Sequence, residues 1–209
     1  MDPEHAFAVL QAHATPGENW PLHSHQVARV ALALVRALGD SGHPVDGPAI
    51  YVQALLHDIG RSRSHGPLHG WTGFTLLRSM GYPRAGRGCL THWIKGRAPE
   101  ELLAAGGFGP SFVARIFAEL EPGWSLADSV ISVADSSVMH STIVPLAERH
   151  SDLLQRYENS AWLRRAVELG ESQAGEIGRL VGTPVETILT PLFGSRLETL
   201  PNAPLPIPT

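Results

Sequence analysis

The residues with the clearest chemical potential are His57 and Asp58, which stand side by side at the end of an apolar run. Ala54-Leu55-Leu56 leads directly into the pair, and Ile59-Gly60 follows it. A buried carboxylate beside a buried imidazole costs free energy unless a positive partner lies between them. Consecutive helical residues point about 100° apart, yet at a helix end both side chains can reach one ion. The pair therefore predicts a metal site.

Helical periodicity predicts the elements that must position this pair. His23 lies four residues before Val27, on the inward face of a helix predicted over residues 21–38. A buried helix predicted over residues 44–58 carries the His-Asp pair at its end, and a polar loop follows it. Because we find no alternating strand pattern and no internal repeat, the predicted fold class is all-α, an irregular helical bundle. Further helices are predicted over residues 3–13, 69–80, 84–93, 100–105, 112–120 and 125–139, with two or three more over 143–193.

Length and composition limit what the protein can be. The 209 residues suffice for one core, so we predict a single domain over 1–200, with its core at 20–140, C-terminal helices at 143–193 and a disordered tail at 201–209. The net charge of −4 offers no basic surface for duplex nucleic acid. No secretion signal and no apolar run near ~20 residues is present, which predicts no membrane association. With Cys89 as the only cysteine, no internal disulfide can form, and we expect a cytoplasmic protein.

The scattered histidine and aspartate motifs resemble the HD-domain family, in the subtype with His-Asp-Ile-Gly at its centre. The family's first motif, His-Ser-x-x-Val-Ala-x-x-Ala, stands here at residues 23–31, and its final Ala-Asp stands at Asp135. Considered without the family, a histidine such as His23 is more often a surface or capping residue, and Asp135 could be a helix-end carboxylate paired with an arginine. The resemblance covers residues 21–139 and implies an HD-domain bundle in which one metal ion is bound by His23, His57, Asp58 and Asp135.

The same resemblance extends to two further histidines. The family pattern His-x-x-x-Gly-x-x-Leu-Leu stands here at residues 69–77, and His92 occupies the next predicted helix. In family members with both, these histidines bind a second metal and the doublet aspartate, here Asp58, bridges the two ions. The alternative is that His69 and His92 contact a substrate phosphate beside a single ion. The expected cofactor is one or two divalent ions of Mn, Fe, Co, Ni or Zn, which suit mixed histidine and carboxylate ligands.

The function implied by the resemblance is hydrolysis of a phosphoester. Metal-bound hydroxide would attack the phosphorus of a small phosphorylated substrate, with a nucleotide as the expected class. The predicted catalytic residues are Asp58, His69, His92 and Arg61. Arginine holds phosphate oxygens bidentately, so positive residues near the ligands are expected to bind substrate, unless they are solvated surface charges. These residues are Arg61, Arg63, Lys95 and Arg97.

Two other functions fit the same residues. Proteins resembling myo-inositol oxygenase and the phosphonate-cleaving oxygenases hold a mixed-valence di-iron pair with the same six ligands and cleave a C–C or C–P bond. Against this function, myo-inositol oxygenase has a lysine after the doublet where this chain has Arg61. The third alternative is a nucleotide-binding sensor without catalysis, which a complete set of buried ligands disfavours because unpaired ligands cost stability. Residues 143–193 either shape the pocket or form the contact of a homodimer.

Overall fold

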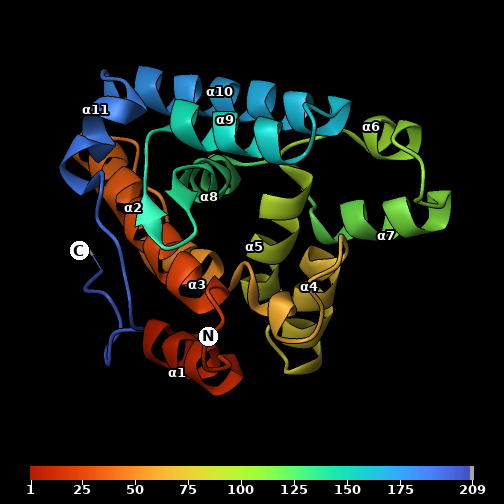
Figure 1. Ribbon diagram of the computed structural model, residues 1–209, viewed down its shortest axis with the longest axis horizontal. Helices are drawn as coiled ribbons and strands as arrows, with labels where there is room; N and C mark the ends of the chain where they lie inside the picture. Colours follow the sequence, from red (N-terminus) through yellow and green to blue (C-terminus); the bar gives the residue numbers. More distant parts are fainter. Residues whose placement is uncertain (208–209) are drawn as a thin grey trace.

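The computed structural model describes residues 1–207 and confirms the all-α fold class (Figure 1). None of the helices in these residues has an apolar stretch long enough to traverse a bilayer. Two short 3-10 helices, η1 (Ile59–Ser62) and η2 (Thr190–Leu192), follow α3 and α11 respectively. The α-helices are α1 (Pro3–His13), α2 (Trp20–Asp40), α3 (Gly47–Leu56), α4 (His69–Ser79), α5 (Pro83–Ile94), α6 (Pro99–Ala104), α7 (Pro110–Glu119), α8 (Leu126–Ser136), α9 (Leu146–Arg156), α10 (Ala161–Val181) and α11 (Val185–Leu189).

The core lies where α2, α3, α5 and α8 pack against one another. α2 contacts α3 and α8, α3 contacts α5, and α4 packs along α5. α9 and α10 run together along one side of the molecule, at the top of Figure 1, while α1 lies at the opposite end and α6 and α7 extend to the right. Apolar side chains at helical spacing fill the centre and are fully buried; among them are Val27, Ala31, Leu34, Ile50, Leu55 and Ile131.

Side-chain caps fix the start of the two helices that end at the predicted site. The Asp46 carboxylate accepts a hydrogen bond from the Ala49 backbone N–H (3.0 Å) at the start of α3. Ser125 and Asp128 form a reciprocal capping box at the start of α8. Because both starts are fixed, the C-terminal ends of α3 and α8 present their polar residues at defined positions.

Two helix ends differ from the prediction, and a small hairpin was missed. α3 ends at Leu56, so His57 caps the helix and Asp58 lies in the following turn. α8 ends at Ser136, and β1 (Val138–Met139) pairs antiparallel with β2 (Thr142–Ile143). Strands of two residues are too short for an alternating pattern to reveal them. The sequence-based prediction of a helix to residue 139 without strands was therefore wrong here.

The chain end was predicted to be disordered, but its described part lies against the core. The backbone N–H of Leu205 faces the hydroxyl of Tyr51 at 3.4 Å. Leu200, Leu205 and Ile207 are half-buried against the apolar core. Apolar residues between the prolines of this segment therefore anchor it as far as residue 207. Residues 208–209 of the predicted tail lie outside the described residues.

Glycine permits a close approach of η1, α4 and α5 that sets the position of His69. A Cβ atom on Gly60 would lie 2.0 Å from the carbonyl oxygen of His69, and one on Gly73 would lie 2.9 Å from Cys89 Sγ. Real Cβ atoms do not approach this closely, so larger residues would separate the elements. Since Gly60 follows Asp58 by two residues, this packing brings the turn that carries Asp58 against the start of α4.

Candidate metal centre

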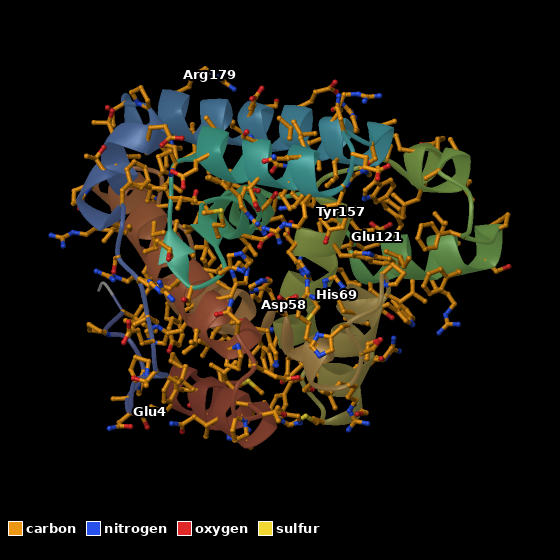
Figure 2. All side chains as sticks on the ribbon, in the orientation of Figure 1. Glu4, Asp58, His69, Glu121, Tyr157 and Arg179 are labelled. Atoms are coloured by element: carbon orange, nitrogen blue, oxygen red, sulfur yellow. The ribbon has the colours of Figure 1, made fainter. Side chains whose placement is uncertain are left out.

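The six predicted metal ligands come together in the interior of the bundle, although as many as 112 residues separate two of them in direct contact. Figure 2 shows Asp58 and His69 near the centre of the molecule, with Tyr157 on the side toward α9. All four helices of the core and α4 contribute to the cluster. The ligands are His23 from α2, His57 and Asp58 after α3, His69 at the start of α4, His92 from α5 and Asp135 from α8.

The ligand atoms form two groups that share Asp58. His23, His57 and Asp58 each offer an atom within 4.8 Å of the others, and the same holds for Asp58, His69 and His92. Asp58 Oδ1 lies 3.4 Å from Nε2 of both His69 and His92. A carboxylate placed between two sets of imidazoles can ligate an ion in each. These buried groups could hold a metal ion, and their mixture of nitrogen and oxygen atoms suits a divalent transition metal.

Asp135 completes the first group from the end of α8. Its Oδ1 lies 3.1 Å from His23 Nε2 and 3.8 Å from His57 Nε2. Its Oδ2 accepts a hydrogen bond from Lys95 Nζ at 2.8 Å, and the same ammonium donates to Ser136 Oγ at 3.1 Å. Burial opposes ionisation of Asp135, but Lys95 and His23 hold the pKa of this carboxyl well below its usual range. Lys95 therefore positions a charged Asp135.

A backbone carbonyl orients each of the four imidazoles from its far side. Because a carbonyl only accepts hydrogen bonds, Nδ1 is the donor in each pair, and Nε2 is the nitrogen that faces the centre. This tautomer and this outer contact are typical of metal-binding histidines. The pairs are His23 Nδ1 with His140 O (3.0 Å), His57 Nδ1 with Ala54 O (2.7 Å), His69 Nδ1 with Gly66 O (3.0 Å) and His92 Nδ1 with Gly88 O (3.4 Å).

The centre contains buried atoms that lack a partner, which a cation would supply. His57 Nε2 and Asp58 Oδ1 are buried without a hydrogen bond, and such atoms cost about 1–3 kcal/mol each. Nε2 of His69 and Nε2 of His92 lie 3.0 Å apart, and with both protons on Nδ1 neither can donate to the other. The residues present thus fit metal binding, since an ion in each of the two groups would supply these atoms with a partner.

Ionisation states at neutral pH agree with this interpretation. Burial lowers the pKa of His57 to about 3 and that of His69 to about 4. Both imidazoles are therefore neutral at pH 7. Burial alone would raise the pKa of Asp58, but His92, His57 and Arg61 hold it well below its usual range. Neutral imidazoles beside charged carboxylates are the protonation states that metal ligands require.

The remaining predicted substrate-binding residues have different environments. Arg61 Nε donates to Asp58 Oδ2 at 2.6 Å, so this guanidinium positions the shared carboxylate. Arg97 is buried, and its guanidinium lies 3.7 Å from the centre of the Trp162 ring. This contact gives the guanidinium a packing role. Arg63 is exposed and does not line the cavity beside the ligands. The role of Arg63 in substrate binding stays a prediction.

A cavity of about 510 Å³ adjoins the ligands, and part of its wall comes from a region whose role the sequence left open. Arg149 of α9 reaches this cavity, and its buried Nε has no hydrogen-bond partner. Its Nη1 donates to Asp152 Oδ2 at 3.0 Å. In the sequence this pair, three residues apart, resembles an ordinary surface ion pair on an amphipathic helix. No sequence signal marked Arg149 as a residue of the site.

Comparison with known proteins adds one relative. No family model and no solved structure matches the chain. A protein of Methanocaldococcus jannaschii, described only as uncharacterized, is 38% identical over 82 residues, which are 39% of this chain and 47% of that protein. The match thus spans about half the length of the relative. The HD-domain resemblance and the implied activity accordingly remain predictions.

Proposed function

We propose that the protein is an HD-domain metal-dependent phosphohydrolase that acts on a nucleotide or another small phosphoester. The observation that supports this most is the sharing of Asp58 between two groups of imidazole ligands at the edge of a cavity. One ion would be held by His23, His57, Asp58 and Asp135, and a second by Asp58, His69 and His92. When bound, such ions polarise a phosphoryl oxygen and lower the pKa of water.

The residues of the chain supply the orientation for this reaction. Arg61 and Lys95 hold the carboxylates of Asp58 and Asp135 at fixed angles, and four backbone carbonyls fix the imidazole rings. The guanidinium of Arg149, which lines the cavity, would donate to a phosphate oxygen, since arginine binds phosphate with adjacent N–H groups. Water adds to phosphorus, the P–O ester bond breaks, and the leaving oxygen takes a proton, which yields inorganic phosphate and an alcohol.

Phosphate release from a panel of phosphoesters tests the proposal. The purified protein is loaded with Mn²⁺ or Co²⁺, and His57→Ala is compared with His43→Ala, which removes an exposed histidine away from the cluster. We expect wild type and His43→Ala to release phosphate and His57→Ala to lose the activity at least 100-fold. Circular dichroism verifies that both variants are folded.

Two results would reject the hydrolase. One is full activity in a folded His57→Ala protein, and the other is no phosphate release from any ester by the metal-loaded wild type. In the second case, oxygen uptake by the iron-loaded protein would support the di-iron oxygenase instead. A protein that holds no metal and releases no product would support the nucleotide-binding sensor.

A further inference from the structure

The cavity beside the ligands has an aromatic half that the proposed hydrolysis does not require. Trp93 extends from α5, Phe108 from the segment between α6 and α7, and Trp162 from α10. The Trp93 and Phe108 rings meet edge to face with centroids 5.7 Å apart. Tyr157 closes the wall at the end of α9, on the side toward the ligands (Figure 2). Smaller apolar residues complete this half of the cavity: Leu153, Leu163 and Ala166.

Protein groups already engage the two positive side chains in this half, although the buried Nε of Arg97 has no hydrogen-bond partner. The buried Arg97 guanidinium lies over the Trp162 ring, and its Nη1 donates to Ile94 O at 3.0 Å. The ammonium of Lys95 is held by Asp135 at 2.8 Å. A chain of additional phosphates would therefore meet cations in this half that Trp162 and Asp135 already engage. The aromatic half is suited to an uncharged part of a ligand.

A second cavity, of about 370 Å³, adjoins the same ligands and has the opposite character. Arg149 and Arg156 line it and share one carboxylate, that of Asp152, so their charges are not fully neutralised. Glu18 also lines this cavity, but His65 lies 3.2 Å from its carboxylate. The predicted metal ligands lie where the two cavities meet. The lining residues common to both cavities are His23, Asp58, Arg61, Arg149, Leu153 and Tyr157.

We propose that the substrate is a phosphoester of an alcohol with a flat apolar ring, and that this ring occupies the aromatic half of the cavity. The phosphate then lies at the ligand centre, toward Arg149. This inference rests on the proposed hydrolase function and specifies its substrate class. The volume of about 510 Å³ is within the range of sites for small organic ligands, roughly 300–1,000 Å³.

The same wall favours an apolar ring over a nucleobase. A base carries nitrogen and oxygen atoms along its edge that need hydrogen-bond partners when buried. Trp93, Phe108, Trp162 and Leu163 make this wall mostly ring face and hydrocarbon, with the hydroxyls of Ser160 and Tyr157 as its uncharged oxygen donors. Leaving base atoms unpaired weakens binding, as in other sites where polar groups lose their partners. An apolar ring meets the same surface without that loss.

A calorimetric titration of the purified full chain tests the substrate class with probes that resist hydrolysis. The probes are 1-naphthylmethylphosphonate, methylphosphonate and a phosphonate analogue of adenosine monophosphate. Because burial of an apolar ring favours binding, we expect the naphthyl probe to bind at least tenfold more tightly than methylphosphonate. We also expect it to bind more tightly than the adenosine probe.

Two neighbouring alanines provide a matched pair of variants. Ala105 is exposed at the end of α6 and lines the cavity, whereas Ala104 is equally exposed but does not line it. Ala105→Trp should place a ring in the aromatic half and reduce the preference for the naphthyl probe to threefold or less. Ala104→Trp should leave that preference unchanged. Since both sites are exposed, neither change disturbs the core.

The outcomes separate the substrate class from the hydrolase. Equal binding of the naphthyl and methyl probes, tighter binding of the adenosine probe, or the same effect of both tryptophan variants would overturn the aromatic substrate class. If phosphate is still released from some ester in that case, the hydrolase stands. A tenfold naphthyl preference that Ala105→Trp removes, without phosphate release from any ester, would support the aromatic site and reject the hydrolase.

Discussion

Replacement of Asp58 by asparagine tests whether one carboxylate serves both groups of ligands. Asp58 Oδ1 lies 3.4 Å from Nε2 of both His69 and His92, and Asp58 also groups with His23 and His57. Asparagine keeps the size of the side chain but removes its negative charge. Asp58→Asn should therefore weaken the binding of both ions. Asp135→Asn should weaken only one ion, because Asp135 faces His23 and His57 alone among the imidazoles.

The expected size of the effect follows from binding linkage. At a free metal concentration 100 times the Kd, binding stabilises the folded state by about 2.7 kcal/mol. A 100-fold loss of affinity, which even an outer partner of a ligand can cause, reduces this to about 0.4 kcal/mol at the same concentration. The difference of about 2.3 kcal/mol for each ion corresponds to roughly 5–9 °C in Tm for a chain of this length, so Asp58→Asn, which affects both ions, should lose about twice as much as Asp135→Asn.

Thermal unfolding with and without Mn²⁺ measures this effect in wild type and both variants. We expect the metal-induced rise in Tm to be nearly lost in Asp58→Asn and about halved in Asp135→Asn. Because each protein is compared with its own metal-free form, any change in intrinsic stability cancels. A full rise in Tm for Asp58→Asn would refute the shared carboxylate. Equal losses in the two variants would contradict the assignment of Asp135 to one group only.

Three further changes have defined outcomes. Burial and the charges of Lys95 and Arg149 lower the pKa of His150 from its usual 6.5 to about 4. Because the unfolded chain binds this proton more readily, the contribution of His150 to the free energy of unfolding is complete above pH 6.5 and is lost toward pH 4. The loss is about 2 kcal/mol at pH 5. In chelator, His150→Phe should lose less Tm between pH 7 and pH 5 than wild type, and equal losses would contradict this. Gly60→Ala should lower Tm by more than 5 °C because its Cβ would lie 2.0 Å from a backbone oxygen. Gly39→Ala should not lower Tm in this way, because its Cβ would lie in open space. Similar Tm values for the two variants would contradict this packing. Arg149→Met should raise KM for a phosphoester at least tenfold and Arg156→Met by less than threefold, because of the two only Arg149 lines both cavities, and the reverse order would contradict the role given to Arg149.

The long amphipathic helices could be predicted from the sequence because their apolar spacing is regular. The helix predicted over 21–38 is α2 (Trp20–Asp40), and the one predicted over 3–13 is α1 (Pro3–His13). The β1–β2 hairpin could not be predicted, since each strand has two residues and the backbone N–H of Ile143 is bonded to distant Ser195. That hairpin matters to the site, because the turn between its strands supplies the His140 carbonyl that orients His23.

The convergence of the ligands could be expected only through the order of motifs along the chain. Periodicity shows that His23 shares an inward face, but it does not show which carboxylate that face meets. The contribution of α9 could not be predicted for the same reason. Its apolar stripe indicates that the helix packs on the bundle, whereas the position of Arg149 beside the ligands depends on how α9 lies relative to α8 and α10. Long-range packing decides such contacts.

The most direct measurement is the anomalous scattering of crystals grown with Mn²⁺, which locates each ion and its ligands. We predict two peaks, one within coordination distance of His23, His57, Asp58 and Asp135 and one within coordination distance of Asp58, His69 and His92. Asp58 should be the ligand common to both. A map without a peak at these residues, or with a peak that Asp58 does not touch, would contradict a metal centre built on this carboxylate.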